Sequence, residues 1–272
     1  MGSDRQWVPK NDLQDLFLKK YFVPLRVFAK NIPEITSIVS HSAQEINEFL
    51  AKNGFTIRLN PFGPLEFGTA SIFDILLKWR VEGEEKDIVR SGSDKVYPGV
   101  RISSKNARFF LSASHPFPIA GLFTKTADIA YITTAAKAPV DEFELMDMIH
   151  HIENGVVGSR NQFAGVHFPK VDLQKMINIA YMLGMETVGD DGQPAVISQA
   201  LMEAITKINQ DGARAKVAAA FGIERCCIMP KSEEDMEVDS PFLFWIKRAK
   251  LPEPLFCAYI TQDDWKDPGN IE

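Results

Sequence analysis

An unbroken apolar run near the end of the chain, Phe242-Leu243-Phe244-Trp245-Ile246, sets the strongest limit on what this sequence can fold into. A strand with one solvated face alternates apolar and polar residues, whereas a strand covered on both faces is apolar throughout. We therefore predict a strand after Pro241 whose side chains are buried on both faces. The chain has 272 residues, near the upper limit of what one core supports, so one large domain or two small ones are both open.

The rest of the sequence mixes strand and helix patterns without strict alternation. Residues 1–54 read mainly as helix, because apolar side chains recur at helical spacing between Leu13 and Phe22, and Ser42 with Glu45 forms a capping-box pattern. Further helices are predicted at Asp141–Glu153, Leu173–Leu183 and Ile197–Asn209. Strands are predicted at Phe55–Leu59, within the β-rich stretch Val96–Ala135, at Gly165–Phe168 and twice within Pro241–Ile260. The apolar stretch Ser71–Trp79 fits either a strand or a buried helix.

No repeat, low-complexity segment or long linker divides this pattern. The simplest interpretation is one α+β domain that covers residues 1–272.

Composition and charge exclude several classes of function. The net charge of −6 argues against binding to nucleic acid or to an anionic membrane surface. No stretch approaches the roughly 18 consecutive apolar residues that a membrane helix needs. The first residues do not read as a secretory signal, and Cys226, Cys227 and Cys257 do not form a disulfide framework. We expect a soluble monomer, with a reducing interior favoured over secretion.

Conventional catalytic and ligand motifs are missing from the sequence. No G-x-S-x-G, P-loop or G-x-G-x-x-G pattern occurs. His150 and His151 are adjacent, and adjacent residues on a helix point about 100° apart, so they cannot hold one metal ion as an i, i+4 pair does. Cys226 and Cys227 lack an identifiable histidine partner. We therefore expect no metal, no cofactor and no enzymatic activity.

The segment Met236–Ile246 carries the most specific pattern in the chain. It combines alternating apolar residues, Asp239, Ser240 and Pro241 with the aromatic-rich strand that follows. Upstream, residues 206–215 read Thr-Lys-Ile-Asn-Gln-Asp-Gly-Ala-Arg-Ala, and Phe168-Pro169-Lys170 is followed by Leu183-Gly184-Met185. In this order and at about this spacing, these segments resemble the C-terminal signature, the hinge and a preceding strand of the serpin family. The resemblance runs from about residue 96 to residue 272.

The resemblance implies a serpin-like α+β fold of mixed sheets with flanking helices and an exposed reactive-centre loop. Serpins are considerably longer, so the chain resembles a member reduced in its N-terminal half. Either Asn60-Pro61-Phe62 stands for an early strand and helix of the family, or Ile72–Trp79 stands for a central strand of its large sheet. Which of the two holds is left open by the sequence.

The implied function is that of a protease inhibitor. A serpin presents its reactive loop, here about residues 212–236, as bait for a serine or cysteine protease and inserts the cut loop into its main sheet. Alternate small residues suit such insertion, and the hinge positions implied are Asn209, Gly212, Ala213, Ala215 and Val217. The same alanine-rich run also has high helix propensity.

The family's usual spacing from hinge to cut bond points to Cys226-Cys227, and a shift of one position points to Arg225, which would attract a trypsin-like protease. The alternative is a non-inhibitory serpin-fold protein that binds another protein, because its shortened fold cannot insert the loop. Both hypotheses give the chain a protein partner.

Overall fold

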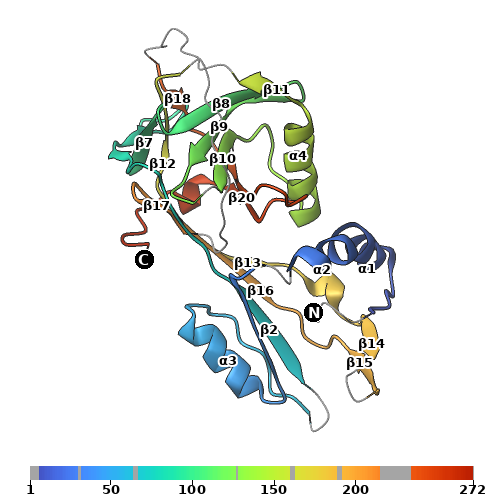
Figure 1. Cartoon of the computed structure of the whole chain (residues 1–272). Coiled ribbons are helices and arrows are strands. Elements are labelled where there is room, and N and C mark those ends of the chain that lie inside the picture. The colour runs from blue at the N-terminus through green and yellow to red at the C-terminus, as the bar shows by residue number, and fades with distance from the viewer. Residues whose placement is uncertain are drawn as a thin grey trace. The chain divides into compact units, whose positions relative to one another are not determined.

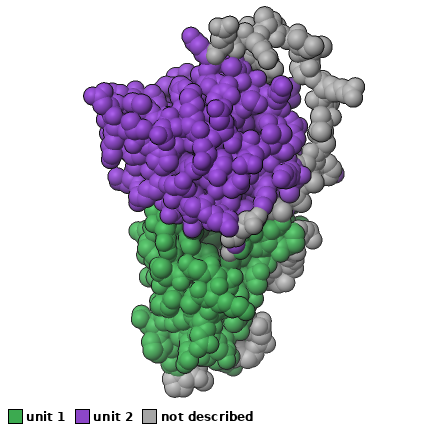
Figure 2. Space-filling view, turned by 90° about the vertical axis from the view of Figure 1, so that its left-hand side faces the viewer, with its two compact units in different colours: residues 1–74, 174–205 green, residues 75–173, 206–272 purple. Residues whose placement is uncertain are grey.

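The computed structural model describes residues 6–29, 32–63, 67–126, 128–159, 163–188, 192–214 and 234–271. The chain divides into two compact units (Figures 1 and 2). Unit 1 comprises residues 1–74 and 174–205, and unit 2 comprises residues 75–173 and 206–272. That the whole chain folds as one domain stays a prediction. Among the described residues, no helix combines the length and the apolar character needed to cross a membrane.

Unit 1 begins with helices α1 (Asp12–Phe17), the π-helical η1 (Leu18–Phe22) and α2 (Val23–Ala29). The buried side chain of Gln14 donates hydrogen bonds of 2.8 Å to the carbonyls of Tyr181 and Leu183, which flank the end of the 3-10 helix η2 (Ala180–Met182). The hairpin of β14 (Glu186–Val188) and β15 (Pro194–Val196) follows η2. A buried amide thus fixes the first helix to a segment far along the chain.

A second layer of unit 1 consists of a helix on a two-stranded sheet. Strands β1 (Ile35–Ser40) and β2 (Gly68–Phe73) pair antiparallel. Helix α3 (Ala43–Lys52) begins at Ser42, whose side chain accepts a hydrogen bond from the Glu45 amide as the capping pattern predicts. Ile46 and Leu50 of α3 pack with Ile72 of β2. The prediction of helix over residues 1–54 is therefore wrong at β1.

The segment Phe55–Leu59 is not a strand, because side chains rather than a neighbouring strand satisfy its backbone. Glu203 accepts hydrogen bonds from the amides of Thr56 (2.7 Å) and Ile57 (3.0 Å) and from the Thr56 hydroxyl (2.8 Å). Gln174 donates a fourth, at 2.6 Å. Burial acts to raise the pKa of Glu203, but these hydrogen bonds together hold it below its ordinary value.

Glu203→Gln is expected to destabilise the protein at pH 7 by about 1–3 kcal/mol, since at least one of the four donors that converge on Glu203 loses its ionised acceptor. The folded pKa of Glu203 is depressed, so its stabilisation is full above the unfolded value of 4.5 and is lost as the pH falls through the folded value. The difference in the free energy of unfolding between wild type and variant should therefore become smaller as the pH falls. Urea titrations from pH 3 to 7 would measure this difference, with Glu48→Gln at an exposed position as the control. A gap that stays constant with pH would contradict the assigned role.

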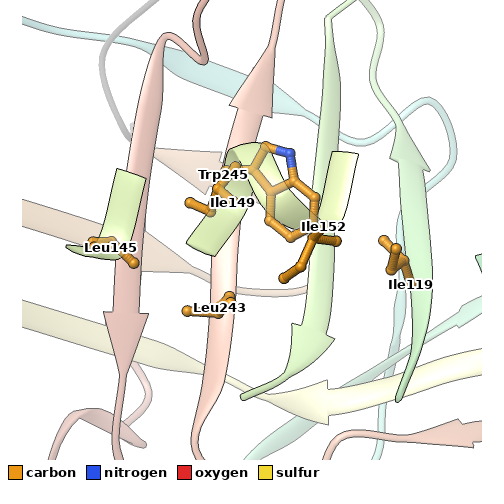
Figure 3. Packing of buried hydrophobic residues seen from close by; sticks show 6 residues of the cluster. All are labelled: Ile119, Leu145, Ile149, Ile152, Leu243 and Trp245. Atoms are coloured by element: carbon orange, nitrogen blue, oxygen red, sulfur yellow. The ribbon is translucent and has the colours of Figure 1, made fainter. Parts of the chain in front are cut away.

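Unit 2 is built around a six-stranded sheet in the order β11-β8-β9-β10-β19-β20. Its strands are β11 (Val156–Ser159), β8 (Ala107–Ser112), β9 (His115–Phe123), β10 (Ile129–Thr134), β19 (Phe242–Lys247) and β20 (Phe256–Ile260). Helix α4 (Glu142–Asn154) lies on one face, where Leu145, Ile149 and Ile152 pack against Leu243 and Trp245 (Figure 3).

The prediction that residues 242–246 form a strand buried on both faces is confirmed. Residues 242–246 are all at most 1% exposed, and β19 pairs with β10 on one side and β20 on the other. On the face away from Leu243 and Trp245, Phe242 lies 6.5 Å from Trp265 and Phe244 lies 6.4 Å from Phe256, centroid to centroid. The strands predicted within residues 96–135 and at 165–168 and the helix predicted at 141–153 are also confirmed.

Two further four-stranded sheets complete the fold. One has the order β18-β12-β7-β4, from β18 (Met236–Glu237), β12 (Gly165–Pro169), β7 (Gly99–Ser103) and β4 (Glu84–Glu85). The other has the order β13-β16-β17-β3, from β13 (Val171–Ile177), β16 (Met202–Ile208), β17 (Gly212–Arg214) and β3 (Leu76–Lys78). The short strands β5 (Ile88–Val89) and β6 (Val96–Tyr97) pair with each other.

The helices predicted at Leu173–Leu183 and Ile197–Asn209 are wrong. The first range holds the end of β13 and the short 3-10 helix η2, and β16 occupies residues 202–208 of the second. Their side chains fit a helical period about as well as a strand period, and hydrogen bonds to distant strands decide between the two. The stretch Ser71–Trp79, left open by the sequence, is also extended, as the end of β2 and all of β3. Overall the chain has the predicted α+β architecture of mixed sheets and few helices.

Candidate functional site

The candidate site begins at β17, the three residues that enter the predicted reactive loop. β17 lies between β16 and β3 and runs antiparallel to both. Ala213 pairs with Ile208 on one side and Leu77 on the other, and is fully buried. Arg214, the next residue, is only partly buried. The predicted hinge residues Gly212 and Ala213 are thus part of a central strand in this structure.

Position 212 requires glycine because the backbone of Leu77 lies too close for any side chain. Its φ is not in the left-handed region, so conformational freedom is not the reason for glycine here. A Cβ at this position would lie 1.9 Å from the carbonyl oxygen of Leu77 and 2.9 Å from its carbonyl carbon. Both are backbone atoms and cannot rotate away. Any side chain would therefore push β17 and β3 apart.

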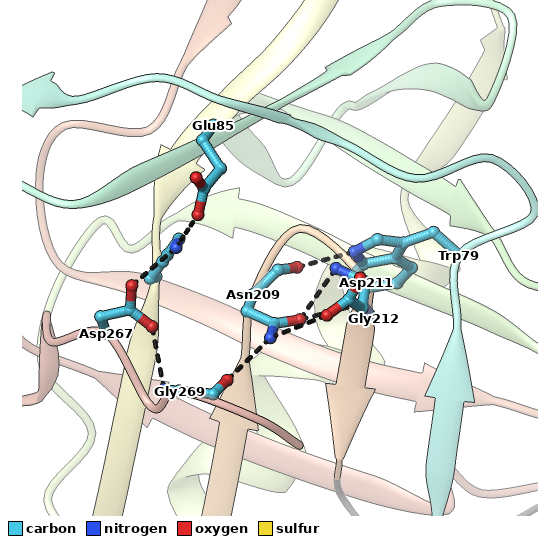
Figure 4. A network of polar contacts seen from close by, with 8 residues as sticks. Trp79, Glu85, Asn209, Asp211, Gly212, Asp267 and Gly269 are labelled. Carbon is cyan, nitrogen blue, oxygen red and sulfur yellow. Dashed lines mark hydrogen bonds and ion pairs between the residues drawn. The ribbon is translucent and has the colours of Figure 1, made fainter. Parts of the chain in front are cut away.

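The turn before β17 is held by Asn209. Its side-chain oxygen accepts hydrogen bonds from the amides of Asp211 (2.8 Å) and Gly212 (3.2 Å), and its backbone amide donates to the Gly212 carbonyl at 2.9 Å (Figure 4). The indole N–H of Trp79, which is 1% exposed, donates to the Asn209 carbonyl at 3.0 Å. The turn from β16 into β17 is therefore held by the side chain of its own Asn209 and by Trp79, the residue that follows β3.

The far end of the loop segment returns to a different sheet. β18 pairs parallel with β12, and the amide of Val238 donates to the His167 carbonyl at 2.8 Å. The side chain of Glu237 lies 2.7 Å from the ring of His167. The segment between Arg214 and Glu234 is thus anchored in the β17 sheet at its start and in the β18 sheet at its end.

A charged pair strengthens the returning anchor. Arg101 donates to both carboxylate oxygens of Asp235, at 2.6 and 2.9 Å. Burial acts to raise the pKa of Asp235, but Arg101 and the nearby Lys86 hold it below its ordinary value. A bidentate guanidinium–carboxylate pair fixes geometry as well as charge. Asp235 therefore stays ionised and holds the returning chain at neutral pH.

The structure brings together only some of the predicted site residues. Asn209, Gly212 and Ala213 meet at the β16–β17 turn. Ala215, Val217, Arg225, Cys226 and Cys227 lie outside the described residues. Sequence reasoning missed Trp79, Arg101 and Asp235. The only sequence signal for Trp79 was its place at the end of an apolar stretch, and the Arg101–Asp235 pair leaves no local signal.

The structure also describes some of the metal, thiol and histidine candidates considered from the sequence. In the part of the chain that the structure describes, no group of three or more His, Cys, Asp or Glu side chains could hold a metal ion. Burial raises the pKa of the Cys257 thiol to about 12, so this cysteine is un-ionised and inert at neutral pH. His150 is paired with Glu253.

Comparison with known proteins gives a consistent result. No family model matches the chain. Serpin-Z2B of rice, Oryza sativa subsp. japonica, is 27% identical over 103 residues, which are 38% of this chain and 21% of that protein. The match therefore spans much less than the relative's whole length.

Three solved structures are similar over most of the chain. A serpin from the trematode Schistosoma haematobium gives a TM-score of 0.56 at 12% identity, with 89% of this chain and 80% of that chain covered. A serpin from Schistosoma mansoni gives 0.52 at 10% identity, with 96% and 72% covered. Serpin48 of the insect Tenebrio molitor, described as a highly specific serpin, gives 0.46 at 16% identity, with 81% and 64% covered. The chain has the serpin fold, shortened relative to these structures, and the matches support its membership of the serpin superfamily.

Proposed function

We propose that this protein inhibits a serine or cysteine protease by presenting the segment that follows β17 as bait. The observation that carries the proposal is the position of β17 between β16 and β3. Within the described ranges, β17 pairs only with Lys207 and Ile208 of β16, which leaves Met202–Thr206 of that edge without a partner strand. An unpaired strand edge is a template for strand addition. The segment that leaves β17 therefore starts beside an edge that it can extend.

The residue pattern suits this extension. Continuing the register of β17 would place Ala215 opposite Thr206 and Val217 opposite Ala204. Ala213 is fully buried at the start of the series, and Ala215, Val217 and Ala219 continue small side chains at alternate positions. Alternate residues of a strand share one face. The proposed inserted strand would therefore present small side chains to the core.

In the proposed reaction the protease nucleophile attacks the carbonyl of Arg225 or Cys226. The peptide bond to the next residue breaks, its nitrogen leaves as the protonated amine of a C-terminal fragment, and the N-terminal part stays attached to the protease as an acyl group. Insertion of the cut segment beside β16 would then displace the attached protease and distort its active site, so that the acyl bond is not hydrolysed.

Mixing the protein with trypsin-like and cysteine proteases tests the proposal. We expect a covalent complex that survives denaturing electrophoresis. We also expect a C-terminal fragment whose mass shows that its first residue is Cys226 or Cys227. Arg225→Ala should abolish the complex with a trypsin-like protease, because the basic side chain that its specificity pocket binds is lost. Lys231→Ala, a matched removal of a cation from the same segment, should leave the complex intact. Cleavage by every protease without a complex would reject inhibition.

The alternative is a serpin-fold protein that binds another protein without trapping it. The chain matches 80% and 72% of the two Schistosoma structures, so part of the fold in each has no counterpart among the residues compared, which favours this reading. Thermal melting of the loop-cut protein separates the two. A large gain in melting temperature indicates insertion, whereas an unchanged melting temperature indicates the non-inserting alternative.

A further inference from the structure

The chain near its C-terminal end, residues 267–271, runs beside the hinge strand. The side-chain amide of Asn209 donates to the Gly269 carbonyl at 2.9 Å, just before β17 begins. The Arg214 guanidinium donates to the Ile271 carbonyl at 3.0 Å, at the last residue of β17. The donors lie on either side of Gly212 and Ala213 of the predicted hinge, and both acceptors are backbone carbonyls of residues 267–271. The two contacts therefore bracket β17.

Residues 267–271 are themselves firmly held within unit 2. Lys170, which is almost fully buried, forms an ion pair with Asp267 at 2.7 Å and a second one with Glu85 (Figure 4). The other Asp267 oxygen accepts the Gly269 amide at 2.9 Å. The hydrogen bond and the charge of Lys170 hold the pKa of Asp267 below its ordinary value. Asp267 thus remains charged and ties this segment to β4 through Lys170.

One apolar anchor lies at the end of this segment and another lies two residues before it begins. Ile271 is 1% exposed, and Trp265 is 2% exposed. The Trp265 ring meets that of Tyr97 edge-on at 5.0 Å between centroids. Burial of this kind is worth far more than a single exposed hydrogen bond. Residues 267–271 are therefore held in unit 2 independently of β17. Their hydrogen bonds with Asn209 and Arg214 can then stabilise β17.

We propose that residues 267–271 act as a strap that holds β17 in its sheet, so that release of the strap and release of the hinge are coupled. Two groups that contact each other only when both are in place stabilise one another equally. Loosening the strap frees β17, and freeing β17 loosens the strap. Any partner that displaced the strap would thereby control whether the hinge is available. That regulatory consequence rests on the proposed inhibitory function, whereas the coupling itself does not.

Hydrogen exchange measured by mass spectrometry on the whole protein tests the coupling. Ile271→Ala removes the apolar anchor and changes no residue of β17. Arg214→Met, at a partly exposed position, removes the hydrogen bond to Ile271 with little change in size. In both, we expect amides of residues 209–214 to exchange at least about tenfold faster, while β10 and β19 keep their rates. Ile149→Ala on α4, also a fully buried isoleucine, controls for general loss of stability.

The reciprocal variant is Gly212→Val, which forces β17 away from β3. Faster exchange in residues 267–271 is then expected, although no residue of the strap has changed. The proposal is overturned if β17 exchanges at the wild-type rate in Ile271→Ala and Arg214→Met, if Ile149→Ala exposes β17 equally, or if the strap is unaffected in Gly212→Val. Because the readout is exchange, absence of protease trapping would reject the proposed function and leave the strap standing.

Discussion

Gly212→Val is expected to expel β17 from its sheet and to abolish protease trapping. The clash begins at Cβ, which would lie 1.9 Å from the Leu77 carbonyl oxygen, and no change of rotamer relieves it. Overpacking of this kind typically costs about 1–3 kcal/mol, and the strand pairs of β17 are lost as well. The free energy of unfolding and the fraction of protease trapped would both be measured.

A matched pair of alanine variants isolates the cause. Gly212→Ala already places the offending Cβ and should show most of the effect. Gly155→Ala would also bring a Cβ close to its neighbours, 2.3 Å from the Ser114 hydroxyl, but this is a side-chain atom that can move. We expect the Gly155 variant to retain trapping. Normal trapping by Gly212→Val would remove β17 from the proposed mechanism.

Phe242→Ala is expected to lower the free energy of unfolding by about 3–5 kcal/mol, because a large fully buried ring leaves a cavity. Phe242 lies on β19, between β10 and β20 and beside Trp265, so its neighbours cannot collapse without moving the sheet. Chemical denaturation would measure the change.

Phe117→Ala is the control for that substitution. Phe117 lies on β9 of the same sheet but is 37% exposed, so we expect a loss below about 1 kcal/mol. Equal losses for the two variants would mean that burial in the six-stranded sheet does not control stability as described.

The contrast between β19 and β16 shows what the sequence could predict. Consecutive apolar residues indicate that β19 is buried on both faces, so a local pattern was sufficient to predict this strand. β16 mixes polar and apolar residues, and its strand conformation depends on pairing with β13 and β17. Such long-range pairing has no local signature, which is why a helix was predicted there.

The candidate site divides in the same way. The family-like run around Asn209 and Gly212 predicted a hinge, because the residue types themselves are distinctive, and the structure brings these residues together at the β16–β17 turn. The reason for the glycine was not predictable, since it depends on the Leu77 carbonyl, far away in the sequence. Arg101 and Asp235 are ordinary surface residue types, and only the fold brings them together. The contacts of Arg214 and Asn209 with residues 267–271 could not be predicted from the sequence either, for the same reason.

The two separate anchors of the loop segment have a consequence for how such a protein can diversify. Among the described residues, the contacts that fix the ends of this segment lie at Gly212–Arg214 on one side and at residues 235–238 on the other. Under the proposed function, these anchors belong to the scaffold, whereas the residues that select the protease lie between them. Exchange of residues 215–233 by grafting should then change the target protease, while the pairing of β17 with β3 and the Arg101–Asp235 pair are retained.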